Sequence, residues 1–164
     1  ARGGEITNDM RRGATMLQWM WVFRIFILIG VTIFTIGQIS GIPDGTKELV
    51  LFLDDLDGTP TATNTTDDWN HWVVYKIPVV SSIAAGSLPS GALVGRNDWN
   101  DNAYGGPCPP VEGQSRVKHN YRFRLYAIDT RITIGPGATR SEIVTAMEGN
   151  ILKGFSLTGY YGGE

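Results

Sequence analysis

The chain has 164 residues and a formal net charge of −2, from 14 Lys and Arg against 16 Asp and Glu. This length suits one domain, and the charge balance excludes a basic protein that holds nucleic acid mainly by neutralising phosphates. One cysteine excludes an intrachain disulfide framework and a multi-cysteine metal site, and two histidines leave little room for a histidine-rich one. We therefore expect no metal, no other cofactor and no nucleic-acid partner.

Residues 17–36 form an apolar run, LQWMWVFRIFILIGVTIFTI, whose one charge is Arg24. A helix of about 20 mainly apolar residues can cross a bilayer, and Trp19 and Trp21 stand near one end, where interfacial aromatics are common. The alternative is a pair of buried strands, because many of these residues are β-branched and Gly30 could mark a bend. Both interpretations stay open, and the compartment, membrane-associated or soluble, depends on which one holds.

After residue 40 the sequence changes to short apolar runs separated by polar and Gly/Pro-rich segments. Two of the runs predict buried strands, ELVLFL at 48–53 and HWVVYKIPVV at 71–80, the second interrupted by Pro78. Other stretches predict turns and loops, namely residues 41–46, 59–70 and 86–110. Long loops of the last kind are often functional in compact domains.

The segment 121–129, YRFRLYAID, alternates between two sets of side chains. One set is Tyr121, Phe123, Leu125 and Ala127, and the other is Arg122, Arg124 and Tyr126. This pattern is typical of a strand with one solvated face. Residues 132–134 would continue the strand after a break.

One helix is expected near the C-terminus. Thr139 and Glu142 fit a capping box, in which each side chain satisfies a free backbone N–H group. The apolar residues that would share a helix face are Ile143, Ala146, Met147, Ile151 and Leu152. Gly154 would end the helix, and the tail FSLTGYY predicts a final strand. The whole pattern predicts a mainly β fold, a β-sandwich with a small C-terminal helix.

Four clusters of polar residues could carry chemistry. They are Asp55-Leu56-Asp57, His71-Trp72, the loop YGGPCPP at 104–110 and His119-Asn120-Tyr121. Alternate residues of an extended chain share a face, so both carboxylates of the first cluster could enter one pocket. A solvated acidic turn, structural histidines and a plain loop are the simpler alternatives. Cys108 lies between prolines, with no helix N-terminus to activate its thiol.

Taken in order, these motifs resemble the phosphatidylethanolamine-binding protein (PEBP) family, also called Raf kinase inhibitor proteins, in its bacterial and archaeal branch. The motifs are GIPDGTK at 41–47, DLD at 55–57, HWVVY at 71–75, YGGPCPP at 104–110, HNY at 119–121, AMEGNIL at 146–152 and LTGY at 157–160. The resemblance covers roughly residues 40–161. It departs from the family at Leu56 and Asn120, where Pro and Arg are usual, and in the apolar residues before the first turn.

The resemblance implies a PEBP-like domain over residues 41–164, preceded by an atypical segment, 1–40, that is either a membrane helix or the first strands of the sandwich. It also implies a small anion pocket for phosphate-like groups, such as a phospholipid head group or a phosphorylated side chain. Carried over by motif, the pocket wall is Asp55, Asp57, His71, Gly106, Pro107, His119 and Tyr121. Imidazole and backbone N–H groups would donate to phosphate oxygens. We add that two carboxylates beside an anion site favour a zwitterionic or protonated ligand.

The function expected on this basis is non-enzymatic binding of phosphate-bearing ligands, with modulation of a partner protein or a homodimer as further expectations. A different class remains open, in which the domain is a membrane-anchored accessory subunit of a larger assembly and the pocket is vestigial. A hydrolase that uses Asp55, His71 and His119 is a weaker third interpretation, because general acid–base geometry is conceivable but no activated nucleophile is evident.

Overall fold

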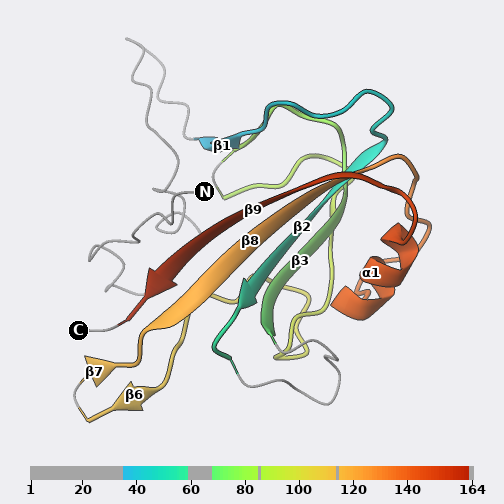
Figure 1. Cartoon of the computed structure of the whole chain (residues 1–164). Coiled ribbons are helices and arrows are strands. Elements are labelled where there is room, and N and C mark those ends of the chain that lie inside the picture. Colours follow the sequence, from blue (N-terminus) through green and yellow to red (C-terminus); the bar gives the residue numbers. More distant parts are fainter. Residues whose placement is uncertain (1–34, 59–67, 85, 114, 163–164) are drawn as a thin grey trace.

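The computed structural model describes residues 35–58, 68–84, 86–113 and 115–162. Its centre is a five-stranded antiparallel sheet in the order β5-β3-β2-β8-β9 (Figure 1). The strands of this sheet are β2 Glu48–Asp55, β3 Trp69–Ile77, β5 Leu93–Val94, β8 His119–Ile128 and β9 Ile151–Tyr161. Two further sheets have two antiparallel strands each. One pairs β1 Thr35–Gln38 with β4 Ser82–Ala84, and the other pairs β6 Val111–Glu112 with β7 Ser115–Arg116. The mainly β class with one short helix, α1 Arg140–Met147, is confirmed.

The central sheet buries both of its faces. Successive side chains of a strand point to opposite faces, and along β2 this alternation separates Leu49 and Leu53 from Val50 and Phe52. The second pair packs with Ile143 of α1, which covers one face (Figure 1). The first pair faces the opposite core, to which residues around β1 and β4 contribute. Strand β2 is central and buried on both faces, which explains why its sequence is a nearly continuous apolar run.

The capping box predicted at the start of α1 is confirmed. The Glu142 amide donates to the Thr139 hydroxyl oxygen at 3.3 Å, and the Thr139 amide donates to the Glu142 carboxylate at 2.8 Å. The predicted end of the helix is wrong, because α1 stops at Met147 and the chain turns at Gly149, whose φ is +75°. Three residues assigned to the helix or its end belong instead to strand β9, namely Ile151, Leu152 and Gly154.

Two expectations about strand β8 are also wrong. Its second face is not simply solvated, because Arg124 and Tyr126 are only partly exposed and Tyr126 packs edge-on against Phe52, 5.9 Å between ring centroids. Residues 132–134 do not extend the strand. Ile132 is instead buried beside α1, and its amide donates to the Glu48 carboxylate at 3.0 Å. A carboxylate from β2 therefore satisfies the backbone group that a continued strand would have paired.

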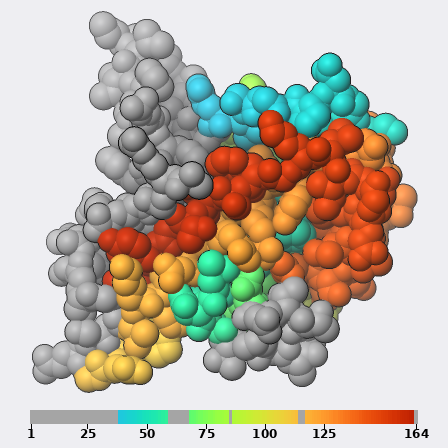
Figure 2. All heavy atoms as spheres, viewed as in Figure 1, coloured from blue at the N-terminus to red at the C-terminus, as the bar shows by residue number. Residues whose placement is uncertain are grey.

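Strand β9 runs along one edge of the sheet and across the molecular surface, coloured dark red in Figure 2. Its first six residues are exposed, including Phe155 with 62% of its surface open to solvent. Its second half is partly buried where it pairs with the beginning of β8. That half of β9 is the one that reaches the end of the sheet where His119 lies.

The apolar run 17–36 lies almost wholly outside the described residues. Its last two residues, Thr35 and Ile36, belong to strand β1. Within the described ranges, no helix is long and apolar enough to span a bilayer. The choice between a membrane helix and sandwich strands for residues 17–34, and the domain boundary at residue 40, remain predictions.

Candidate functional site

The carboxylate of Asp55, the last residue of β2, is the centre of a buried polar cluster. The residue is only 4% exposed. Its Oδ2 lies 2.7 Å from Nδ1 of His119, on the neighbouring strand β8, and 3.9 Å from Nε2 of His71, on β3. Its Oδ1 accepts a hydrogen bond from the Asp57 amide at 3.0 Å. Strands β2, β3 and β8 are adjacent in the sheet, so their ends bring these groups together.

A β-bulge in β3 turns His71 toward Asp55. Leu53 pairs with Trp72 and Asp54 pairs with Asn70, so His71 is an extra residue opposite no partner in β2. Without the bulge, alternation would place His71 on the α1 face, opposite to Trp72. The extra residue lets both side chains approach the same face, which is a common role of bulges beside binding sites.

The hydrogen bonds fix which nitrogen of each imidazole carries a proton. Nδ1 of His71 lies 3.1 Å from the carbonyl oxygen of Gly105, which can only accept, so Nδ1 donates. The Gly105 amide donates back to the His71 carbonyl at 3.0 Å, which ties the loop to β3. Nδ1 of His119 donates in the same way to Asp55. In His119, Nε2 is therefore the nitrogen left for a ligand, whereas Nε2 of His71 lies on the side of Asp55.

Tyr121 completes the cluster from strand β8. Its ring packs edge-on against His71, with 5.3 Å between centroids, and the residue is 1% exposed. On its other side His71 packs edge-on against Trp99, at 4.7 Å. The histidine ring is thus held by a buried tyrosine, a tryptophan and a backbone carbonyl, and it loses little rotational freedom when a ligand binds.

The electrostatics of the cluster keep Asp55 ionised. Burial opposes its ionisation, but the hydrogen bonds from His71, from His119 and from the Asp57 amide outweigh burial, so the pKa of the Asp55 carboxyl lies below its ordinary value. Burial, and then the negative charge of Asp55, raise the pKa of Tyr121, which therefore keeps its proton. The site holds one carboxylate, two imidazoles and one neutral phenol.

The comparisons with known proteins agree on one family. The phosphatidylethanolamine-binding protein family model matches residues 33–162. The chain belongs to the phosphatidylethanolamine-binding protein family.

Relatives in this family come from archaea and bacteria. A UPF0098 protein of Methanothermobacter thermautotrophicus is 40% identical over 128 residues, 74% of this chain and 78% of that protein. A UPF0098 protein of Pyrococcus horikoshii is 37% identical over 131 residues, 76% of this chain but only 62% of the longer relative. The crystal structure of a phosphatidylethanolamine-binding protein homolog from Chlamydia trachomatis superposes with a TM-score of 0.66 at 34% identity, covering 77% of this chain and 79% of that one. Family membership supports a ligand-binding role in general terms.

The structure brings four of the seven residues predicted from the family motifs directly together, namely Asp55, His71, His119 and Tyr121. Asp57 is exposed, and its carboxylate accepts hydrogen bonds from the backbone amide of Asn120 at 2.6 Å and from its side chain at 2.9 Å. Strand β2 ends at Asp55, so the alternation that would turn Asp57 toward the same pocket does not continue that far.

The loop 104–110 approaches the cluster through residues other than those predicted. Gly105 is the residue of this loop that forms hydrogen bonds with His71, one through its carbonyl oxygen and one through its amide. Gly106 and Pro107 follow it and are partly buried. Trp99 was not predicted either. Gly105 stood within the quoted motif, but nothing local in the sequence signals that Trp99 packs against a histidine 28 residues earlier in the chain.

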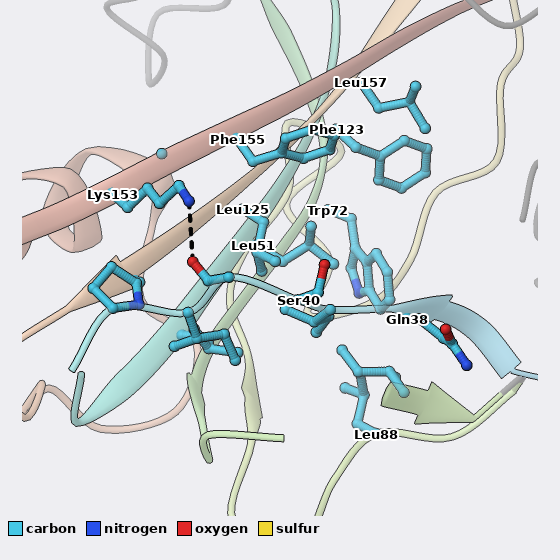
Figure 3. Close-up of a pocket in the computed structure, with 18 of the residues that line it drawn as sticks. Gln38, Ser40, Leu51, Trp72, Leu88, Phe123, Leu125, Lys153, Phe155 and Leu157 are labelled. Atoms are coloured by element: carbon cyan, nitrogen blue, oxygen red, sulfur yellow. Dashed lines mark hydrogen bonds between the residues drawn. The ribbon is translucent and has the colours of Figure 1, made fainter. Parts of the chain in front are cut away.

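A separate hollow lies on the same face of the sheet as the polar cluster. It has a volume of about 280 Å³ and is lined mainly by apolar side chains, including Leu51, Trp72, Phe123 and Leu125 (Figure 3). At its rim Lys153 donates to the Gly41 carbonyl at 3.0 Å (Figure 3). Tyr121, Phe123 and Leu125 follow one another on this face of β8, so the hollow continues the row of side chains that begins in the polar cluster.

Proposed function

We propose that this protein binds small phosphate-bearing ligands, free or as a phospholipid head group, at the cluster of Asp55, His71, His119 and Tyr121. In this proposal the protein catalyses no reaction of the bound ligand. The observation that carries the proposal is the convergence of two imidazoles and one phenol on a single buried carboxylate. Imidazolium and phenol groups are hydrogen-bond donors suited to phosphate oxygens. A phosphorylated side chain of a partner protein presents the same chemistry.

In this proposal Asp55 does not contact the anion. It orients the histidine rings that do. Its Oδ2 accepts a hydrogen bond from Nδ1 of His119, so Nε2, on the opposite edge of that ring, is left for a ligand. A phosphate oxygen would accept a hydrogen bond from Nε2 of His119 when that ring carries both of its protons, and Asp55 would then balance the positive charge of the ring.

Titration with inorganic phosphate, followed by the ring signals of His71 and His119 in NMR spectra, tests this proposal. We expect both ring signals to shift in a saturable manner, and phosphoethanolamine to shift the same two rings. Unchanged signals at both rings up to tens of millimolar phosphate would contradict the proposal.

A pair of tyrosine variants separates the site from the rest of the strand. Tyr121→Phe removes the phenol hydrogen of the cluster, and Tyr126→Phe removes the same atom from the opposite face of β8, against Phe52. Loss of one neutral hydrogen bond to a charged group predicts about tenfold weaker phosphate binding for Tyr121→Phe. Tyr126→Phe should bind phosphate as the wild type does.

A further inference from the structure

The two edges of the central sheet differ in length. At one edge lies β5, which has only two residues, Leu93–Val94. At the other edge lies β9, which has eleven, Ile151–Tyr161 (Figure 1). One side of β9 pairs with β8, and no strand among the described residues pairs with its other side. The backbone N–H and C=O groups on that side of residues 151–159 are therefore open to a further strand.

Strand β9 lacks the features by which proteins usually protect a sheet edge. Natural edges are short, are broken by proline or a bulge, or carry several charged side chains. This strand has no proline and one charge, Lys153, and its pairing with β8 is regular from Lys153 onward. Three apolar side chains of its first half are exposed, namely Ile151, Leu152 and Phe155. A long, exposed and apolar edge of this kind is a template for pairing with another strand.

The sequence of β9 is complementary to itself when a second copy runs antiparallel to it. All eleven residues pair if a two-fold axis passes through Ser156, the middle residue. Phe155 then lies opposite Leu157 of the second copy, and Lys153 lies opposite Gly159. Opposite side chains on one face of an antiparallel pair are in contact. The exposed phenyl ring therefore gains an apolar neighbour, and the lysine meets a residue without a side chain.

The position of the single charge also favours a second copy as the partner. In this register the Lys153 residues of the two copies are six positions apart along the strands, about 20 Å, so their ammonium groups repel each other little. Moving the axis to Phe155 or to Leu157 leaves two residues of each β9 without an opposite residue. The register centred on Ser156 thus pairs the most backbone groups and keeps the charges apart.

We propose that β9 is a dimer interface, at which β9 of a second copy of this chain pairs with it antiparallel around Ser156. The two central sheets then form one continuous sheet of ten strands. A two-fold axis perpendicular to a sheet keeps each face on its own side, so the hollows lined by Phe155 and Leu157 open on the same side of the joint sheet (Figure 3). This inference does not rest on the proposed function.

Disulfide cross-linking of the full chain tests the register. Ser156→Cys, in a Cys108→Ser background that removes the exposed native cysteine, places two thiols at the two-fold axis. Opposite residues of antiparallel strands have Cα atoms about 4.5–5.5 Å apart, within reach of a disulfide. We expect mild oxidation to link most chains in pairs. Lys153→Cys in the same background is the control, and it should stay unlinked because its copies lie about 20 Å apart.

Analytical ultracentrifugation of the full chain measures the same interface without a cross-link. We expect the wild type to sediment with twice the mass of one chain. Phe155→Lys removes the apolar contact with Leu157 of the second copy at two symmetric places, and it should raise the dissociation constant at least about 30-fold. Val79→Lys, at a side chain 48% exposed and outside the central sheet, is the matched control and should leave the dissociation constant within about twofold.

Three results would overturn the inference. The first is a wild-type chain that stays monomeric at about 100 μM, since a specific interface binds more tightly than this. The second is a dimer whose dissociation constant is the same in Phe155→Lys as in the wild type. The third is cross-linking of Lys153→Cys as readily as of Ser156→Cys, which would indicate chance collisions or another register. None of these results bears on phosphate binding at the polar cluster, which the NMR titration tests separately.

Discussion

Asp54 and Asp55 are neighbours on β2, both buried, yet they face opposite sides of the sheet and have different partners. Asp54 is 0% exposed and lies 2.5 Å from Nη2 of Arg124 and 3.1 Å from Nε of Arg140, the first residue of α1. Asp55 is 4% exposed and is paired with His119 and His71. Two consecutive aspartates thus have different partners. Asp54 pairs with arginines, which are always charged, and Asp55 pairs with histidines, which can lose their charge.

The different partners suggest different roles, a structural one for Asp54 and a place in the candidate site for Asp55. A guanidinium stays charged at every physiological pH and matches a carboxylate with fixed geometry, and the Asp54 carboxylate raises the pKa of Arg124 further against the opposing effect of burial. Such a pair joins β2, β8 and α1 and has little reason to open. An imidazole can gain or lose its proton near neutral pH, so the partners of Asp55, unlike those of Asp54, do not carry a permanent charge.

The comparison predicts its largest effect at Asp54. Asp54→Asn removes the buried carboxylate that joins Arg124 and Arg140, which should lower the free energy of unfolding by about 3–5 kcal/mol. Urea denaturation at pH 7 measures this. Asp68→Asn is the matched control, because Asp68 pairs with Arg122 at 2.6 Å and with Arg124 at 3.3 Å, but its side chain is 18% exposed. Its loss should be about 1 kcal/mol. Equal losses in the two variants would contradict the structural role of Asp54.

A second difference concerns two glycines, one on each side of the sheet. A Cβ at Gly95 would lie 2.4 Å from the Ala138 carbonyl oxygen and 2.7 Å from Val73, on the α1 side, where the backbone cannot move. A Cβ at Gly105 would meet the exposed ring of Trp99, which can rotate away. We expect Gly95→Ala to cost about 2–3 kcal/mol and Gly105→Ala about 1 kcal/mol.

Thermal unfolding of the two glycine variants checks this order, and the NMR titration with inorganic phosphate adds a second measurement. Gly105→Ala should weaken phosphate binding by disturbing the loop whose carbonyl oxygen holds His71, in spite of its small effect on stability. A Gly105→Ala variant that unfolds as readily as Gly95→Ala would show that the Trp99 loop is part of the rigid structure.

The sequence predicted those features that depend on local pattern. The strand at 48–53, the turn at 41–46 and the capping box at Thr139 all follow from residues close together in the chain. The members of the cluster were found through the family motifs, because each motif lies at the end of a predicted strand. Alternation along a strand could not place His71, since the bulge that turns its side chain is set by the pairing of β3 with β2.

Contacts between distant residues were beyond prediction from the chain alone. Arg124 reaches Asp54 across 70 positions of the sequence, so the alternation of β8 suggested a solvated face where there is a buried ion pair. The helix was extended to Gly154 because Ile151 and Leu152 continue its apolar spacing. In the structure these residues form the exposed start of an edge strand, where pairing with β8 outweighs helical periodicity.

The last effect we predict depends on pH and concerns Asp55. Its folded-state pKa lies below the 3.8 of an unpaired aspartate, so its ionised form stabilises the fold above about pH 4. That contribution is lost as the pH falls through the folded-state value, because the carboxylate must then take up a proton. Asp55→Asn keeps the shape but removes the charge, and it should cost about 2 kcal/mol at pH 7.

The difference between wild type and Asp55→Asn should therefore shrink as the pH falls below about 4, as measured by urea denaturation at a series of pH values. Asp44→Asn, at an exposed turn, is the control and should differ from wild type by less than about 0.5 kcal/mol throughout. A constant difference at Asp55 over the whole range would mean that shape, not charge, holds the cluster. In that case the two carboxylates of β2 would have different partners, but the contribution of Asp55 to the free energy of unfolding would not depend on pH. The contrast between a permanent ion pair at Asp54 and a titratable one at Asp55 would then fail.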